Sequence, residues 1–461
     1  MLSVAVIGGG AAGLAAVSYL LREKDIHVTL FEERSGFGGV WTNQSTSTQP
    51  NPMYDGLETN VPHTLMTFTG HHWPRNTPVF PPHDQVLSYL RTYTARIRDP
   101  TRSTVHLSTK VVELRLASDN TWAITTESLF GRVELSFNAV VIAAGNYSDP
   151  HITPDEPGRN VWADRGNHIM HSSEFKNANA FTNKRVLIVG NGPSGWDISE
   201  RVARVAAEVV VSVRSLPMTV APGVNRAVGL IKKYEWRTRT VTFYEGKEMS
   251  DIDVVIYCTG YRFNFPFAIK YDTDRNAQPL FPPGFRVRDL FQHMFYISQP
   301  SLALVGLPKM TAAFTVAEAQ SAVIARVFSG RITLPAKQAM ESWNRSFIAE
   351  HRSAMISDSN FHSLPTRTDK DKDYVNFLER VCATASDRFL GKPPPYWCNC
   401  LDSAKASVGA IRAVFKAQGG NSAFSTTYHQ LGALLVTPCT SENLQACPTG
   451  ATCCFLDPAT R

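Results

Sequence analysis

Two glycine-rich stretches, each directly after a short apolar run, constrain the fold of this chain more than any other feature. The first, GGGAAG at residues 8–13, follows Val4–Ile7, and the second, GNGPSG at residues 190–195, follows Val186–Val189. Both have the spacing G-x-G-x-x-G, which predicts a strand, a tight turn and a helix that together bind a dinucleotide. The sequence therefore predicts an α/β fold with two Rossmann-like dinucleotide-binding domains.

Residues of opposite charge follow the two glycine-rich stretches at the same distance. Glu32 and Arg214 each lie 24 positions after the first glycine of their stretch (8 to 32 and 190 to 214). A carboxylate at this position accepts hydrogen bonds from ribose hydroxyls, whereas an arginine suits a 2′-phosphate. We therefore predict two different dinucleotides, the second of them phosphorylated. The alternative for Arg214, a surface arginine at a strand end, is disfavoured by its register with Glu32.

The turns supply most of the predicted binding residues. In each turn the first glycine permits a sharp bend, the second lets the backbone approach a pyrophosphate, and the third allows close packing of helix on strand. Ser194 adds a hydroxyl beside the second pyrophosphate. The predicted binding residues are Gly8, Gly10, Gly13 and Glu32 at the first site, and Gly190, Gly192, Ser194, Gly195 and Arg214 at the second.

Two similar apolar strands that end in glycine divide the chain. Residues 139–145 and 253–260 share this pattern, and we expect the chain to cross between domains there, so that the second domain is an insertion into a discontinuous first one. The alternating residues 105–116 and 122–137 predict antiparallel strands. We predict residues 1–150 and 251–335 as the first domain, 151–250 as the inserted domain, 336–400 as a helical extension and 401–461 as a poorly packed or disordered tail.

Composition places the chain among globular proteins. Its 461 residues leave room for a large core, and 43% apolar with 19% charged residues is typical of that class. The net charge of +6 comes from scattered Lys and Arg, so we do not expect nucleic-acid binding. A strand that begins at about Leu2 leaves no room for a cleavable signal peptide, and no stretch reaches the ~20 apolar residues of a membrane span. We expect a cytoplasmic protein; its oligomeric state is not indicated by the sequence.

Cysteine is concentrated at the C-terminal end. Only Cys258 lies in the first 381 residues, and the other seven are Cys382, Cys398, Cys400, Cys439, Cys447, Cys453 and Cys454. Their spacings match no familiar zinc-ligand pattern, so we predict no metal site and interpret them as free thiols. A pyridine-nucleotide disulfide reductase also binds two dinucleotides but requires a redox-active cysteine pair near the first one. The absence of cysteine before Cys258 argues against that class.

Several stretches resemble flavin-containing monooxygenases, a family of class B flavin-dependent monooxygenases. Besides the two turns, they are residues 38–41 (GGVW), 54–62 (YDGLETNVP), 79–83 (VFPPH) and 258–261 (CTGY), and the resemblance covers about residues 3–330. It implies FAD in the first domain and NADPH in the second. The chain is then expected to be an enzyme, an FAD-dependent monooxygenase that uses NADPH.

The resemblance also implies a chemistry and a set of site residues. NADPH would reduce the flavin, O₂ would add at its C4a atom, and the hydroperoxyflavin would oxygenate a nucleophilic nitrogen or sulfur of a small organic substrate, with a role in secondary metabolism expected. Asn60 matches the family's active-site asparagine between flavin and nicotinamide; the alternative is an asparagine that caps a loop. The positions that match family residues in contact with the cofactors or near them are Val40, Trp41, Asn60, Val61, Val111 and Gln320.

The family's identifying motif, Phe-x-Gly-x-x-x-His-x-x-x-Phe/Tyr, is only partly present. Its end is intact at His171 and Phe175, where we expect His171 to have a structural role, but Arg165 and Asn167 occupy its Phe and Gly positions. Phe175 stands where Baeyer–Villiger monooxygenases have Trp, which favours oxygenation of a heteroatom. Two alternatives stay open: a Baeyer–Villiger monooxygenase that acts on a ketone, and a non-catalytic cofactor-binding interaction protein.

Overall fold

The fold is described from a computed structural model, which covers two compact units. The described residues are 1–42, 51–74, 76–153, 156–166, 168–271, 276–365, 368–387 and 390–417. Unit 1 comprises Met1–Thr42, Glu58–Gly145 and Asn264–Arg461, and unit 2 comprises Asn43–Leu57 and Asn146–Phe263. Asn167 of the altered motif, and residues 418–461 of the predicted tail with their four cysteines, lie outside the described residues.

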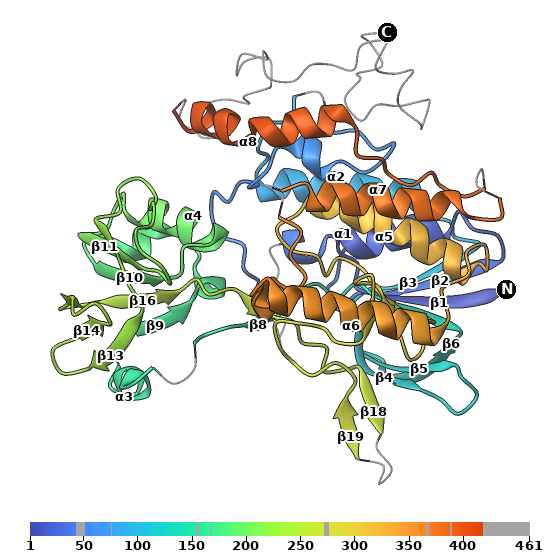
Figure 1. The fold of residues 1–461 in the computed structure, drawn as a ribbon, viewed down its shortest axis with the longest axis horizontal. Coiled ribbons are helices and arrows are strands. Elements are labelled where there is room, and N and C mark those ends of the chain that lie inside the picture. The colour runs from blue at the N-terminus through green and yellow to red at the C-terminus, as the bar shows by residue number, and fades with distance from the viewer. Residues whose placement is uncertain are drawn as a thin grey trace. The chain divides into compact units, whose positions relative to one another are not determined.

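Unit 1 is built on a seven-stranded sheet with the order β20-β21-β22-β7-β1-β2-β3 (Figure 1). Its parallel strands are β1 (Leu2–Ile7), β2 (Ile26–Phe31), β3 (Ser103–His106), β7 (Ala139–Ile142) and β22 (Leu302–Leu304). The short strands β20 (Leu290–Phe291) and β21 (Phe295–Tyr296) add an antiparallel edge. Strands β1 and β7 are apolar at consecutive positions because both faces of the sheet are covered.

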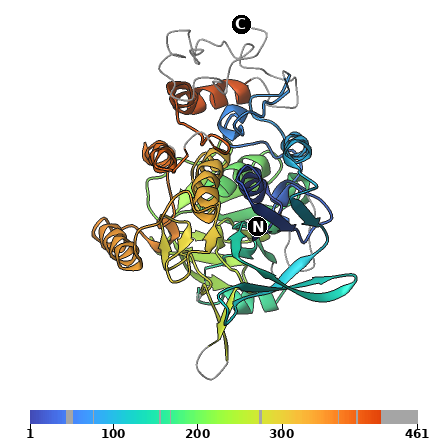
Figure 2. The same ribbon diagram turned by 90° about the vertical axis from the view of Figure 1, so that its right-hand side faces the viewer.

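Helices and a small antiparallel sheet cover the two faces of this sheet. Helices α1 (Ala11–Leu20) and α5 (Ala313–Phe328) share one hydrophobic core with it, and the sheet β4-β5-β6 lies on the opposite side from α1 (Figures 1 and 2). The other helices of unit 1 are α2 (His83–Ile97), α6 (Lys337–Ser353), α7 (Lys370–Ala383) and α8 (Asn399–Ala417), with the 3₁₀ helices η1 (Gly39–Thr42), η2 (His63–Met66) and η5 (Asp358–Asn360). Its remaining strands are β4 (Lys110–Leu116), β5 (Trp122–Ser128), β6 (Gly131–Phe137), β18 (Ile269–Tyr271) and β19 (Ala277–Pro279).

The expected antiparallel strands are confirmed except at one end. Strands β4, β5 and β6 pair antiparallel in sequence order. Val105 and His106, however, belong to β3, which pairs with β2 in parallel. The prediction of one strand over 105–116 is wrong there because residues 107–109 turn the chain from one sheet into the next.

Unit 2 contains a five-stranded parallel sheet with the order β12-β11-β10-β16-β9. These strands are β9 (His168–His171), β10 (Arg185–Val189), β11 (Glu208–Ser212), β12 (Arg226–Val228) and β16 (Val254–Tyr257). The unit also has the strands β8 (Asp149–Pro150), β13 (Ile231–Glu235), β14 (Thr240–Phe243), β15 (Glu248–Met249) and β17 (Tyr261–Arg262). Its helices are α3 (Arg159–Asp164), α4 (Pro193–Val202), η3 (Ser172–Glu174) and η4 (Ala178–Phe181).

The predicted fold class is confirmed, but the predicted boundaries need correction. The chain leaves unit 1 after Gly145 rather than after residue 150, and it returns at Asn264 rather than at residue 251. The second boundary moves because β16 is an inner strand of unit 2, paired with both β10 and β9. Unit 2 also includes residues 43–57, in which Tyr54 is buried against the ring of Phe175.

The start of the predicted tail is ordered. Residues 401–417 were expected to pack poorly, yet they form most of helix α8. The helix is held because Leu401, Ala404, Ile411 and Phe415 are buried on unit 1. The prediction is therefore wrong for this part of the tail.

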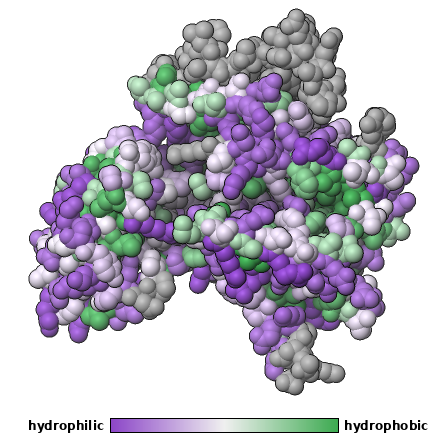
Figure 3. All heavy atoms as spheres, viewed as in Figure 1, coloured by the Kyte–Doolittle hydropathy of each residue, from purple (hydrophilic) through white to green (hydrophobic). Residues whose placement is uncertain are grey.

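The surface in view in Figure 3 is mostly hydrophilic, with scattered hydrophobic residues on both units. In the part of the chain that the structure describes, no helix is both long enough and apolar enough to cross a membrane.

Candidate cofactor sites and active-site segment

The first glycine-rich turn connects β1 to α1 in a geometry that two of its glycines make possible. Gly8 has φ of +108°, and a Cβ atom on it would lie 2.4 Å from the carbonyl oxygen of Ala143. A Cβ atom on Gly13 would lie 1.8 Å from the carbonyl oxygen of Gly8. Both positions exclude any larger residue, so the first turn of α1 packs directly on the ends of β1 and β7.

Glu32, at the end of β2, is fixed against this turn. Its side chain is 4% exposed; Oε2 accepts a hydrogen bond from the Gly9 N–H (2.7 Å), and Oε1 accepts one from the Arg34 N–H (2.8 Å). Burial raises the pKa of this carboxyl, and the two backbone hydrogen bonds oppose that effect. The carboxylate is thus held beside the turn, with further lone pairs that can accept hydrogen bonds from ribose hydroxyls.

Two other segments that carry predicted residues adjoin the first turn. The Gly38 N–H donates to the Gly9 carbonyl (2.9 Å), which brings η1 with Val40 and Trp41 next to it. The Thr109 N–H donates to the Glu32 carbonyl (2.9 Å), and the buried Val111 follows two residues later in β4. The structure therefore brings these predicted residues together around one turn.

Gln320 is fully buried in α5 and is hydrogen-bonded to the loop that contains Gly306. Its Oε1 accepts from the Gly306 N–H (2.9 Å), and its Nε2 donates to the Tyr374 hydroxyl (3.1 Å). A Cβ atom on Gly306 would lie 3.0 Å from the Cβ of Ala12, so this loop lies directly against α1. Gly306 is not among the site residues predicted from the sequence. Its place directly after an apolar strand, residues 302–305, is the signal that could have found it.

Asn60 is exposed, and its side chain makes no hydrogen bond to another residue that the structure describes. The local hydrogen bond is made instead by Thr59, whose hydroxyl donates to the Val61 carbonyl (2.8 Å). The alternative that Asn60 caps its loop therefore finds no partner atom among the described residues. Its carboxamide is free to donate to and accept from a ligand.

The second turn, between β10 and α4, repeats the geometry of the first. Gly190 has φ of +100°, and a Cβ atom on it would lie 2.7 Å from the Cys258 carbonyl oxygen. A Cβ atom on Gly195 would lie 2.0 Å from the Gly190 carbonyl oxygen. Neither α1 nor α4 has a side chain that caps its first turn, so both helices begin with free N–H groups that suit a pyrophosphate.

The residue that ends the strand–turn–helix–strand segment differs between the two sites. Arg214 is exposed and makes no ion pair with any described residue. Ser194 lies in the first turn of α4, and the buried Oδ1 of Asn191 has no hydrogen-bond partner within the described part of the chain. A cation, a hydroxyl and an unsatisfied acceptor thus lie at this end of the sheet, where a phosphorylated dinucleotide would use them.

His171 organises the backbone of unit 2. Its Nδ1 accepts from the Ser173 N–H (3.1 Å), which fixes the neutral tautomer with the proton on Nε2, and Nε2 then donates to the Gly260 carbonyl (3.1 Å). Burial lowers the pKa of this histidine. With both ring nitrogens engaged, His171 has a structural role in the segment that closes β16.

Among the described residues, Cys258, Cys382 and Cys398 are not part of a disulfide. Burial raises the pKa of both Cys258 and Cys382 to about 12, so neither thiol ionises at neutral pH. Among residues that the structure describes, no group of His, Cys, Asp and Glu is arranged to hold a metal ion.

Comparison with known proteins agrees with this two-site arrangement. The family described as FMO-like, flavin-binding monooxygenase-like, matches residues 2–221 and 215–389. The thiol-specific monooxygenase of Saccharomyces cerevisiae is 29% identical over 338 residues, which cover 70% of this chain and 76% of that protein. Flavin-containing monooxygenase FMO GS-OX5 of Arabidopsis thaliana is 31% identical over 367 residues, 74% of this chain and 76% of that protein. The solved structure of S-allyl-L-cysteine S-oxygenase from Allium sativum has a TM-score of 0.76 and 27% identity, and the match covers 94% of this chain and 97% of that one.

Two nested dinucleotide folds with these matches define a flavoprotein monooxygenase. The chain belongs to the FMO-like family of flavin-binding monooxygenases. It is therefore an enzyme that uses FAD and NADPH, and the alternative of a non-catalytic interaction protein is wrong.

The residues present fit both cofactors. The first turn offers the uncapped N-terminus of α1 and the fixed Glu32 carboxylate, which we assign to FAD. The second offers the uncapped N-terminus of α4 and the Arg214 guanidinium, which we assign to NADPH. The individual contacts of these residues with the cofactors stay predictions.

Proposed function

We propose that this enzyme uses NADPH and O₂ to oxygenate a nucleophilic sulfur or nitrogen atom of a small organic substrate, with sulfur the first choice. As the resemblance implies, we place the substrate among the metabolites of secondary metabolism. The observation that carries the choice of sulfur is the extensive match, over 94% of this chain, to a protein named as an S-oxygenase. The name of the yeast relative, thiol-specific monooxygenase, points to the same element.

The chemistry at the described sites also supports oxygen transfer to a soft nucleophile. Such a substrate attacks with its own lone pair, so no acid–base pair of the protein is needed to activate it. Bound FAD, reduced by NADPH, supplies the activation of O₂. The chain's own contribution is to bind and orient the reactants and to keep water away from them.

Each proposed residue has one task in this scheme. Glu32 and the first turn hold FAD, and Arg214 and the second turn hold NADPH. The free carboxamide of Asn60 orients the flavin and nicotinamide rings by hydrogen bonds. Gln320 keeps the Gly306 loop against α1.

The overall reaction balances without another reactant. NADPH supplies two electrons and a proton from solvent is taken up; one atom of O₂ enters the substrate and the other leaves as water. A thioether would give its S-oxide and a tertiary amine its N-oxide. A ketone in a Baeyer–Villiger reaction would give an ester or lactone instead.

The test is oxygen labelling with a panel of nucleophiles. The FAD-loaded enzyme is incubated with NADPH under ¹⁸O₂ and either a thiol, S-allyl-L-cysteine, trimethylamine or cyclohexanone. Mass spectrometry then measures labelled product, and a peroxide assay measures the NADPH oxidised without oxygen transfer. Each substrate is compared with a reaction that lacks it.

We expect labelled product from a sulfur compound, with one labelled atom for each NADPH consumed. Labelled N-oxide alone would keep the proposed chemistry and move the substrate class to amines. Labelled lactone without heteroatom product would replace the proposal by Baeyer–Villiger oxygenation. Peroxide equal to NADPH with every member of a broad panel would contradict it.

A further inference from the structure

Asn60 lies in a segment with little regular structure of its own. Residues 59–69, here called the Asn60 segment, contain only the short helix η2, so their position depends on contacts with other parts of unit 1. The segment runs beside residues 79–82: the Thr59 N–H donates to the Pro81 carbonyl (3.1 Å), and the His63 N–H donates to the Val79 carbonyl (2.8 Å). Near its C-terminal end, the Phe68 N–H donates to the Tyr89 hydroxyl (2.7 Å). Further contacts at both ends of the segment involve residues from much later in the chain.

The N-terminal end of the Asn60 segment is bound by helix α8. The guanidinium of Arg412 donates to the Thr59 carbonyl oxygen at 2.6 Å. This carbonyl belongs to the planar peptide unit that joins Thr59 to Asn60, so the hydrogen bond fixes the orientation of the backbone from which the Asn60 side chain projects.

Helix α8 itself packs against residues 79 and 80, which lie beside the Asn60 segment. Val79, Phe80, Ile411 and Phe415 form a buried cluster in which no side chain is more than 2% exposed. The ring centres of Phe80 and Phe415 lie 5.0 Å apart, and the Arg412 guanidinium lies 4.8 Å from the centre of the Phe80 ring. The Phe80 ring thus restricts Arg412 to the direction of Thr59.

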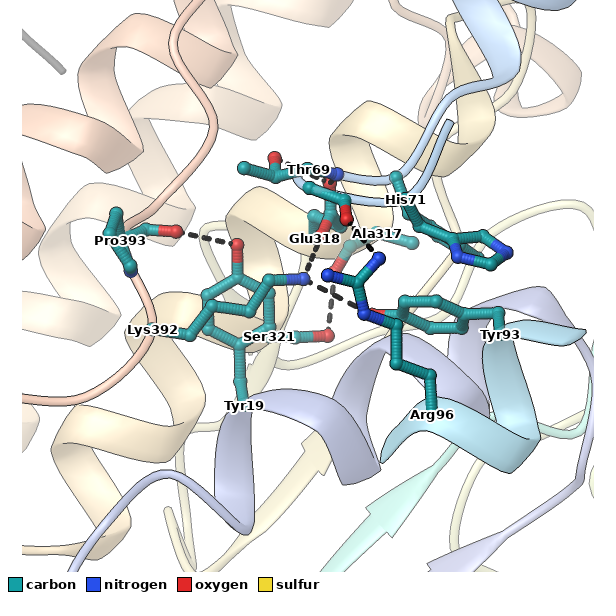
Figure 4. Close-up of polar contacts among 12 residues, drawn as sticks. Tyr19, Thr69, His71, Tyr93, Arg96, Ala317, Glu318, Ser321, Lys392 and Pro393 are labelled. Atoms are coloured by element: carbon teal, nitrogen blue, oxygen red, sulfur yellow. Dashed lines mark hydrogen bonds and ion pairs between the residues drawn. The ribbon is translucent and has the colours of Figure 1, made fainter. Parts of the chain in front are cut away.

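The C-terminal end of the Asn60 segment is bound by a buried ion pair, shown in Figure 4. The Glu318 carboxylate, 1% exposed, accepts from the N–H and the hydroxyl of Thr69 (2.8 and 2.9 Å). Its other oxygen accepts from the Lys392 ammonium, which also donates to the Tyr93 hydroxyl (3.1 Å). Burial acts to lower the pKa of Lys392, but the Glu318 carboxylate and Tyr93 outweigh it, so the amine stays protonated.

Arg412 binds Thr59 directly, and Lys392 binds Thr69 through Glu318 of α5. Both basic residues lie in residues 390–417, which follow the last matched family segment and for which the sequence predicts no function. We propose that this C-terminal extension sets the position of Asn60, with Arg412 and Lys392 as positioning residues at the two ends of the Asn60 segment. This inference rests on the proposed role of Asn60 in oxygenation.

Arg412 offers the cleaner test because it contacts the Thr59–Asn60 peptide directly. Arg412→Met removes the hydrogen bond to Thr59 but keeps a long side chain over Phe80. A shift of about 1 Å in a positioned group costs up to ~100-fold in rate, so we expect a loss of about tenfold or more in kcat for oxygenated product. KM for NADPH and the bound FAD should stay as in the wild type. The peroxide formed per NADPH should rise as product falls.

Two further variants separate positioning from a general loss of charge or structure. Arg345→Met removes an exposed arginine from α6, which has no described contact with the Asn60 segment, and should leave product and peroxide unchanged. Arg412→Lys keeps a donor within reach of the Thr59 carbonyl. It should recover part of the lost coupling, that is, of the oxygenated product formed per NADPH consumed. A purely structural role would change FAD content and Tm rather than the ratio of peroxide to product.

The outcomes distinguish this inference from the proposed function. If the wild type gives no oxygenated product, the proposed function fails first. If the wild type is coupled and Arg412→Met binds FAD and is equally coupled, the inference is overturned while the proposed function stands. If Arg412→Met does not retain FAD, Phe415→Leu decides: it loosens the α8 seat against Phe80 and should raise peroxide in the same direction, and an unchanged ratio overturns the inference.

Discussion

The two dinucleotide-binding turns of this enzyme have nearly the same backbone geometry, but the residues predicted to bind the two riboses, Glu32 and Arg214, have opposite charge. Both turns require glycine at the same two places, because a Cβ atom there would overlap backbone carbonyl oxygens. Glu32, however, is buried and already hydrogen-bonded to two N–H groups, whereas Arg214 is exposed and has no ion-pair partner within the described chain.

This difference fits the tasks assigned to the two cofactors. A preorganised carboxylate loses little freedom on binding, which favours a cofactor that stays bound. A solvated guanidinium gains a charge-assisted contact only while the ligand is present, which suits a cosubstrate that exchanges in every turnover. We therefore expect FAD to copurify with the protein and NADPH to exchange.

The third glycine of each turn gives the largest expected effect. Gly13→Ala would place a Cβ atom 1.8 Å from the Gly8 carbonyl oxygen, and Gly195→Ala would place one 2.0 Å from that of Gly190. We expect the first variant to lose up to about 100-fold in FAD affinity, since overpacking costs up to ~3 kcal/mol. The second should keep FAD and lose NADPH. Flavin absorbance after gel filtration and an NADPH titration measure the two effects.

A matched control lies close to the first turn. Gly36→Ala adds a Cβ atom with no other atom within 4 Å, and it should retain FAD. Release of FAD by Gly195→Ala as complete as that by Gly13→Ala would show that the two turns do not serve separate cofactors.

The second glycine of each turn separates the needs of the fold from those of the ligand. A Cβ atom on Gly10 would make an ordinary contact, 3.5 Å from the Gly39 Cα, and one on Gly192 would meet nothing within 4 Å. The alanine variants should therefore keep the wild-type Tm. If pyrophosphates approach these backbones, Gly10→Ala weakens FAD and Gly192→Ala weakens NADPH, each by about 10- to 100-fold. Thermal unfolding and calorimetric titration test both points, and unchanged affinities would contradict the assigned approach.

Arg214 should affect one cosubstrate without affecting the fold. Arg214→Ala removes a charge-assisted hydrogen bond to the 2′-phosphate worth about 1.5–3 kcal/mol, which predicts a rise in KM for NADPH of about 10- to 100-fold. NADH lacks this phosphate, so its KM should stay the same. Steady-state kinetics with both nucleotides provide the measurement. An equal rise for both would exclude phosphate recognition by Arg214.

The last expected effect concerns stability rather than cofactor affinity: the two units should differ in their sensitivity to acid. In unit 1 the Val287 N–H donates to Nε2 of His362 (3.1 Å), so its neutral ring carries the proton on Nδ1 and donates it to Nδ1 of His293 (2.9 Å). Burial lowers the pKa of His293 to about 4 and that of His362 well below its usual value. Neither ring can accept another proton at these atoms without losing a hydrogen bond.

The sign of the pH effect follows from these shifts. Between about pH 6.5 and 4 the unfolded chain binds protons that the folded His293 and His362 do not, so stability falls as pH falls. The slope is up to about 1.4 kcal/mol per pH unit for each histidine. Hydrogen exchange at pH 7 and pH 5 should show unit 1 losing protection more than unit 2. Equal protection of unit 1 at both pH values would argue against this pair as the cause.

The sequence predicted what is determined locally. Both turns, their strands and helices, and the nested arrangement follow from short patterns of apolar residues and glycine. Glu32 was found because its distance from the turn is fixed by one helix and one strand. The sites of Val40, Trp41 and Val111 rested on resemblance, and the structure explains their proximity by hydrogen bonds to Gly9 and Glu32.

What the sequence could not predict depends on partners far apart in the chain. Arg412 and Thr59 are 353 residues apart, and Lys392 and Glu318 are 74 residues apart, so no periodicity connects them. The sequence indicates at most a short helix at residues 407–414, because the Ser, Ala and Gly residues of α8 form a weak pattern. Its full length and its packing depend on the contact of Ile411 and Phe415 with Phe80. The described part of segment 43–57 joins unit 2 through the burial of Tyr54, which has no local signal.

The central claim is that the carboxylate and the guanidinium assign the two turns to different nucleotides, and parallel binding measurements test it most directly. FAD and NADP⁺ are titrated against Glu32→Gln and Arg214→Ala. The amide of the first variant must turn its NH₂ toward the N–H of Gly9 or Arg34, so the account predicts weaker FAD and unchanged NADP⁺ binding. For the second variant it predicts unchanged FAD and weaker NADP⁺ binding. Equal weakening of both ligands in either variant would contradict it.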